Sequence, residues 1–144
     1  MGRVYNALLA KALGLPVENS KMKVVLKRFE NPDEVTHFEK GKFETVELGG
    51  MTIGRATYEP GWKWSNNVGA ALGEDFCHVE HVGMVVSGCA TAAFADGRVT
   101  EMHAGDLFYV PPEPHDSWVV GDEPYVSLHF FGACLLYTSP SPRD

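Results

Sequence analysis

The sequence predicts an all-β protein built as an antiparallel barrel or as two packed sheets. Short runs rich in Val, Thr, Phe and Tyr recur along the chain and are bounded by turn residues. Two of the turns, Gly49-Gly50 and Asp96-Gly97, are typical of tight hairpins, which join antiparallel strands. No long helical pattern follows the first 14 residues. Many short strands in a chain of this size favour a closed or two-sheet fold that protects its strand edges.

The first residues predict a short amphipathic helix. Apolar positions recur at helical spacing over residues 4–15, and Gly14 and Pro16 end the run. Lys11 interrupts the apolar stretch and residues 17–20 lack a small-x-small cleavage pattern, so we do not interpret this segment as a signal peptide. The cytoplasm is the expected location by default.

The barrel domain is predicted to begin at Met22. Residues 23–26 are strand-like and the β pattern continues from there, so Met1 and Met22 are both candidate starts. We expect residues 1–21 to be an N-terminal extension and residues 22–133 to form a single domain. A chain of this length can bury an ordinary apolar core, so it needs neither a disulfide nor a structural metal to fold.

Seven strands are predicted after this start. Each is a short run of β-branched and aromatic residues between turn signals. The predicted strands cover residues 43–48, 51–58, 79–86, 89–95, 106–110, 117–120 and 125–131.

The end of the chain has a different character. Residues 134–144 lose every strand signal and resemble translated sequencing-adapter DNA. We expect them to be a disordered tail that is not native to the protein; a native Ser/Pro-rich tail is the alternative. In either case we assign no function to Cys134.

The charge balance excludes several classes of partner. The 144 residues include 12 Lys+Arg and 19 Asp+Glu, for a formal net charge of −7. Neutralising phosphates requires a basic face, so neither a nucleic acid nor an anionic membrane surface is an expected partner. No apolar run reaches the roughly 18 to 20 residues of a membrane span. The 3 cysteines are odd in number and irregular in spacing, so no disulfide framework is predicted.

The histidines gather in the second half of the chain, and one of them follows a recognisable motif. Gly105-Asp106 turns into a strand, Pro111-Pro112 ends that strand, and His115 follows. Together with the pattern of strands over residues 50–132, this arrangement resembles the second motif of the cupins. Cupins are small jelly-roll barrels whose two motifs supply metal ligands from adjacent strands. The resemblance implies an antiparallel jelly-roll β-barrel.

The first cupin motif is present only in part. In the family it reads His-x-His, three or four residues, Glu, six residues and Gly, and here the glycine corresponds to Gly88. Counting back from it places His81 where the family has its glutamate, and the sequence departs from the motif at the first three ligand positions. The stretch of residues 58–65, together with Cys77, resembles a subgroup of small single-domain cupins.

Strand geometry ranks the possible metal ligands. Side chains alternate between the faces of a regular strand, so Cys77 and His81 share one face and His78 the other. We expect His81 and His115 to bind one metal ion. The third ligand could be His78 through a β-bulge, Cys77, or His129 from the last strand. Imidazole ligands without the family's carboxylate favour copper or iron; ligation by Cys77 would move the preference toward copper or zinc.

Other residues have predicted supporting roles. Glu80, Asp116 and His129 are candidates for hydrogen bonds that orient the ligand imidazoles. Trp62, Trp64 and Trp118 lie near strand ends and are candidate substrate contacts at the mouth of the barrel, although a tryptophan in a small domain is more often a core or loop anchor. Three further side chains, His37, Cys89 and His103, are interpreted as structural.

The resemblance and the histidines imply a metal-dependent cupin. The leading interpretation is a copper- or iron-dependent oxidoreductase that acts on a small-molecule or carbohydrate substrate, with oxidative polysaccharide cleavage as one such reaction. The alternatives are a non-catalytic ligand- or carbohydrate-binding module and a zinc-dependent hydrolase or lyase. The expected cofactor is one transition-metal ion. Because cupins commonly pair through sheet edges, a homodimer is expected, with residues 23–29 as the pairing strand.

Overall fold

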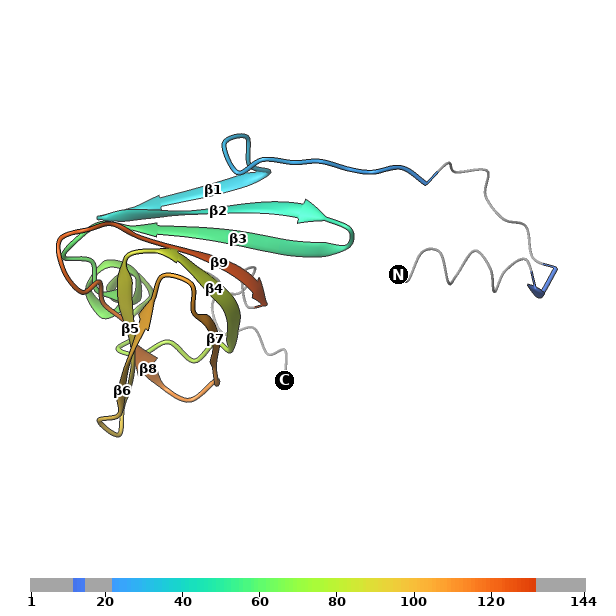
Figure 1. Ribbon diagram of the computed structural model, residues 1–144. Coiled ribbons are helices and arrows are strands. Elements are labelled where there is room, and N and C mark those ends of the chain that lie inside the picture. Colours follow the sequence, from blue (N-terminus) through green and yellow to red (C-terminus); the bar gives the residue numbers. More distant parts are fainter. Residues whose placement is uncertain (1–11, 15–21, 132–144) are drawn as a thin grey trace.

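The computed structural model describes residues 12–14 and 22–131, which form two antiparallel sheets around one core (Figure 1). Most of the predicted N-terminal helix over residues 4–15, and the predicted tail over residues 134–144, lie outside the described residues. The all-β, antiparallel fold class predicted from the sequence is confirmed.

The larger sheet has six strands in the order β1-β2-β3-β9-β4-β7. Their bounds are Glu34–Phe38 (β1), Gly41–Leu48 (β2), Met51–Tyr58 (β3), His81–Ser87 (β4), Leu107–Val110 (β7) and Tyr125–Phe131 (β9). The smaller sheet has the order β6-β5-β8. Its strands are Cys89–Phe94 (β5), Val99–His103 (β6) and His115–Asp116 (β8). A π-helical turn, η1 (Ser65–Gly69), continues into α2 (Ala70–Leu72) between β3 and β4.

Alternation along the central strands directs the chemistry-bearing side chains inward. On β9 the buried positions are Tyr125, Ser127 and His129, and on β4 they begin with His81 and continue at every second residue. β4 lies between β9 and β7, and its first residue, His81, is one of the buried positions, so its side chain faces the barrel interior. The two histidines are therefore brought to the same side of the sheet by strand geometry alone.

The core between the sheets is aromatic. The ring of Tyr58 stacks on Trp62 with centroids 3.6 Å apart and lies 5.9 Å from the ring of Tyr125. Gly83 permits the close approach of the strands around it, because a Cβ at this position would meet the carbonyl oxygen of Leu128. The packing holds β3, β4 and β9 close together next to the buried histidines.

Several predicted elements are confirmed. Strands occur where the sequence predicts them over residues 43–48, 51–58 and 125–131. The two hairpin turns also form: Gly49 and Gly97 both have positive φ, at 59° and 100°. The backbone of Phe94 pairs with that of Arg98 across the second turn.

Two predicted strands do not form, and two observed strands, β1 and β6, were not predicted. Residues 23–29 form no strand; they lead into β1 with Val24 and Leu26 exposed, so β1 is one edge strand of the larger sheet (Figure 1). Residues 117–120 make only isolated bridges, because their partners are a loop and one position of β5. β1 and β6, both largely exposed, had too little apolar alternation to be predicted.

Candidate metal centre

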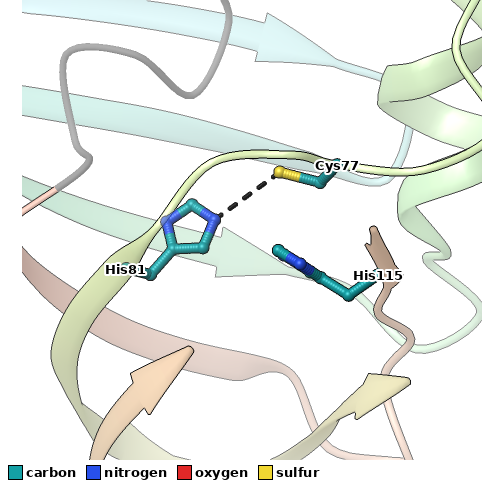
Figure 2. A group of neighbouring side chains, drawn as sticks. All are labelled: Cys77, His81 and His115. Atoms are coloured by element: carbon teal, nitrogen blue, oxygen red, sulfur yellow. Dashed lines mark hydrogen bonds between the residues drawn. The ribbon is translucent and has the colours of Figure 1, made fainter. Parts of the chain in front are cut away.

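Three buried side chains converge inside the barrel. The Sγ atom of Cys77 and one ring nitrogen each of His81 and His115 lie within 4.8 Å of one another. Their residues are 4%, 6% and 4% exposed. Figure 2 shows the three side chains turned toward one another from the segment before β4, from β4 and from β8. A set of ligand atoms this compact could hold a metal ion.

Backbone pairing places Cys77 beside His115. The two residues form an isolated antiparallel bridge, with the Cys77 amide donating to the His115 carbonyl at 2.7 Å and the reverse bond at 3.0 Å. The two ligands are 38 positions apart in the chain, so this pairing, rather than a local motif, joins them. His81 completes the set because it begins β4 with its side chain directed inward.

The imidazole of His115 is held in one orientation. Its Nδ1 donates to the backbone carbonyl of Glu113 at 2.8 Å. Nε2 therefore carries the lone pair and is free to bind a cation. Burial lowers the pKa of His115, and nearby His78 acts in the same direction, while the bond to Glu113 and the charge of Asp116 oppose the shift. The ring is neutral at neutral pH, which is the form that binds metals.

His81 and Cys77 contact each other directly. Nε2 of His81 lies 3.6 Å from Sγ of Cys77, and Nδ1 of His81 is buried with no partner among the described residues. Burial, followed by the proximity of His129 and His115, lowers the pKa of His81 well below its ordinary value. Burial raises the pKa of the Cys77 thiol to about 11. Without a cation all three side chains are uncharged.

The spacing of these atoms fits a metal ion. Two ligand atoms held tetrahedrally by zinc, at about 2.3 Å for sulfur and about 2.0 Å for nitrogen, lie roughly 3.5 Å apart. The Sγ–Nε2 separation of 3.6 Å matches this value, and the other two separations are at most 4.8 Å. A bound cation would also stabilise the thiolate that burial now disfavours. The donor set of one sulfur and two nitrogens therefore suits a borderline or soft transition metal.

A small cavity adjoins the three side chains. Its volume is about 50 Å³, and its lining includes Tyr58, Phe108 and His129 as well as the three candidate ligands. A water molecule needs roughly 10–15 Å³ by this measure, so the cavity holds a few waters or a molecule of similar size. The candidate metal site thus has room for an added ligand on its cavity side.

Comparison with solved structures identifies the fold. A protein with a double-stranded β-helix domain from Klebsiella pneumoniae superposes with a TM-score of 0.51 at 16% sequence identity, covering 77% of this chain and 91% of that one. The chain has the cupin fold. The double-stranded β-helix is the jelly-roll barrel of the cupins, so the predicted jelly-roll class is also confirmed.

Two other solved structures are similar at lower scores. A Rhizobium leguminosarum protein of unknown function has a TM-score of 0.49 at 19% identity, covering 75% of this chain and 95% of that one. The Lactobacillus farciminis oxalate decarboxylase formate complex has a TM-score of 0.49 at 21% identity, covering 69% of this chain and 30% of that one. No family model matches the chain, and no curated protein matches it.

Within this cupin barrel, the three candidates for the third ligand lie in different places. Cys77 joins His81 and His115. His78 is exposed and is not part of the compact group, because residues 78–80 form no strand and no bulge turns its side chain inward. His129 is buried next to the group, with its ring centroid 5.5 Å from that of His81.

His129 has no charge at neutral pH. Burial lowers its pKa to about 4. Its Nε2 lies 3.0 Å from Oγ of Ser127, while Nδ1 is buried without a partner among the described residues. The ring packs edge-on against Phe43 and Phe108. His129 therefore forms a polar part of the cavity wall beside the ligand group.

The predicted orienting carboxylates have other partners. Glu80 accepts a hydrogen bond from the hydroxyl of Tyr109 at 2.6 Å. Asp116 accepts bonds from the backbone amide and the hydroxyl of Ser65, at 3.0 and 2.8 Å. The group that orients an imidazole is instead the Glu113 carbonyl, which sequence reasoning missed because every residue carries a carbonyl.

The three tryptophans do not share one environment. Trp62 and Trp64 are buried, line the cavity, and have indole N–H groups without an acceptor among the described residues. Trp118 is half-buried, with the ammonium of Lys63 5.6 Å from its ring centroid. Two of the predicted mouth residues thus lie inside the barrel.

Within residues 12–14 and 22–131, no helix has the length and apolar character needed to cross a membrane.

Proposed function

We propose that this cupin is a copper-dependent oxidoreductase acting on a small organic substrate. The observation that carries the proposal is the convergence of Cys77, His81 and His115, all buried and all uncharged, at the edge of a cavity. Three protein ligands with an open side are typical of catalytic metal sites, whereas structural sites are closed by four.

The donor set favours copper. Sulfur and imidazole donors select copper and zinc, and copper lies at the top of the affinity order for divalent first-row metals. No carboxylate belongs to the compact group among the described residues, which makes iron and manganese weaker candidates. Bound copper supplies one-electron redox chemistry at this position.

The chain's own residues prepare the site in two ways. The Glu113 carbonyl fixes the His115 ring so that Nε2 faces the group. The wall of the cavity includes the aromatic rings of Tyr58, Trp62 and Phe108. An apolar wall has a lower local dielectric than water, which strengthens electrostatic interactions with a charged ligand or substrate group.

The size of the cavity bears on the substrate. At about 50 Å³ it admits dioxygen, peroxide or the end of a small molecule, but no polysaccharide chain. A metal held by Cys77, His81 and His115 would leave room in this cavity for a small oxidant and for the reacting group of an organic substrate. Carbohydrate oxidation is compatible with the proposal only at an exposed sugar end.

Zinc chemistry is the second candidate, since the same Cys/His/His donors suit zinc with a bound water as nucleophile or base. A cupin that binds its ligand without a metal is the third. The three are separated by purifying the chain without chelators and measuring its metal content. We expect about one copper per chain at the inner site, a paramagnetic copper signal, and oxygen consumption with a reductant.

The matched variants are His81→Ala with His115→Ala, and His37→Ala as an exposed control on β1. The double variant should lose the inner copper and the oxygen consumption, and the control should keep both. Zinc in place of copper, with no oxygen consumption, would favour the hydrolase or lyase. Absence of any transition metal, together with unchanged thermal stability on adding one, would overturn both metal-dependent proposals.

A further inference from the structure

A second group of potential ligands lies on the outer face of the barrel. Cys89 on β5 is directly opposite His103 on β6 in the antiparallel register. Glu101 is two residues before His103 and so points to the same face of β6. The neighbouring residue Met102 lines the inner cavity, so this face is the outward one.

The ligand atoms in this second group are as close together as those inside. One atom each from Cys89, Glu101 and His103 lies within 4.8 Å of the others. Nε2 of His103 is 3.3 Å from Oε1 of Glu101. On the other side of the ring, Asp106 accepts a hydrogen bond from the His103 amide at 2.8 Å and lies 3.9 Å from Nδ1. The ring is thus placed between two carboxylates.

The charge at this face is negative and lacks a fixed counter-ion. In residues 12–14 and 22–131, neither Glu101 nor Asp106 forms an ion pair with a lysine or arginine; their partner is His103. Burial, and then the charges of Glu101 and Asp106, raise the pKa of the Cys89 thiol. The same charges that disfavour an unaccompanied thiolate favour a cation.

There is also space above the group. An open hollow of about 460 Å³ is lined by Cys89 and His103 and by the acidic residues Asp122 and Glu123. A cation held by the three side chains would therefore keep access to water or to a further oxygen ligand from this hollow.

We propose that Cys89, Glu101 and His103 form a second metal site, which binds Zn²⁺ on the outer face of the β5–β6 hairpin. Zinc combines sulfur, nitrogen and carboxylate donors in tetrahedral sites. Calcium and magnesium take oxygen ligands and would leave the thiol and the imidazole unused. This proposal does not depend on the function of the inner site.

The first test is a zinc titration of the whole chain against a chromophoric competitor. We expect Cys89→Ser combined with His103→Gln to bind one zinc equivalent fewer than the unmodified chain. Thr100→Ala, exposed on the same strand, is the matched control and should bind as much zinc as the unmodified chain. A double variant that binds as much zinc as the control would overturn the proposal.

The second test measures the reactivity of the Cys89 thiol directly, so it needs no variant of the inner site. The chain is alkylated with and without Zn²⁺, and modification of Cys89 is measured by peptide mass spectrometry. Zinc should slow the alkylation of Cys89, and Glu101→Gln or His103→Gln should remove that protection. Equal alkylation with and without saturating zinc, or protection that survives His103→Gln, would contradict the site.

Discussion

The two Cys/His groups of this barrel use similar donors in opposite surroundings. The inner group of Cys77, His81 and His115 is buried, and its three side chains are uncharged without a cation. The outer group has the same kinds of sulfur and nitrogen donors, but Glu101 and His103 are exposed. Burial thus removes charge from the first group, while exposure preserves it in the second.

This difference determines what a metal ion would change. Inside, a cation would bring a positive charge among three neutral side chains and would shift the thiol from protonated to ionised against the cost of burial. Outside, a cation would compensate carboxylates that are already charged. We therefore expect the inner site to govern stability and its dependence on pH, and the outer site to respond mainly to the metal supplied in solution.

The largest expected effect is the pH dependence of the metal-free protein. Burial lowers the pKa of His129 to about 4, below the ordinary value of 6.5 for histidine. Between these values the unfolded chain binds more protons, so the free energy of unfolding falls as the pH falls from 6.5 toward 4. A shift of this size corresponds to about 3 kcal/mol. Urea unfolding at a series of pH values, after removal of metal, measures it.

One histidine variant and a control variant test the contribution of His129. His129→Gln should reduce the slope of unfolding free energy against pH between 4 and 6.5, and His81 and His115, whose pKa values are also lowered, keep part of it. Thr100→Ala, an exposed position on β6 that does not titrate, should leave the slope as it is in the unmodified chain. An unchanged slope in His129→Gln would show that burial of His129 does not cause the loss of stability at low pH.

A smaller change in the free energy of unfolding is expected from replacing the aspartate next to each group, Asp116 inside and Asp106 outside. Asp116 is buried and accepts bonds from both Ser65 groups and from the Ser117 amide. Asp116→Ala leaves these donors without an acceptor and should lower the free energy of unfolding by about 2 kcal/mol. Asp106→Ala removes one exposed bond, to the His103 amide, and should lower it by much less because water can replace the bond. Chemical denaturation compares the two; equal losses would contradict the contrast in burial.

The smallest expected effect is a difference in thiol reactivity without metal. Cys77 is buried and its thiol has a pKa of about 11, whereas Cys89 is half-buried at the surface. A neutral alkylating reagent should therefore modify Cys77 more slowly than Cys89. Peptide mass spectrometry resolves the two rates, and Cys134→Ser removes the third thiol from the reaction. Faster modification of Cys77 would mean that the barrel opens readily.

Local patterns predicted the parts of the fold that depend on neighbouring residues. A run of β-branched and aromatic residues between turn signals identified the strand over residues 51–58, and the Gly49-Gly50 and Asp96-Gly97 pairs identified the hairpins. The same patterns failed where a distant partner decides the outcome. Residues 23–26 have strand-forming side chains, but no neighbouring strand pairs with them in the described structure.

The candidate site was predicted only in part for a related reason. His81 and His115 were expected to act together, and they do lie in one group. The third member could not be chosen from the sequence, because alternation applies only to a regular strand and Cys77 is fixed by a bridge to His115. The outer group was missed altogether, since only the register of β5 against β6 brings Cys89 opposite His103.

The central claim is that Cys77, His81 and His115 together hold one metal ion, and X-ray absorption at the metal edge tests it most directly. Copper is loaded to one equivalent onto a chain that carries Cys89→Ser, so that the outer thiol does not contribute. The account predicts one sulfur and two nitrogen ligands, with the sulfur signal lost after Cys77→Ser. A spectrum with only nitrogen and oxygen ligands, unchanged by Cys77→Ser, would contradict it.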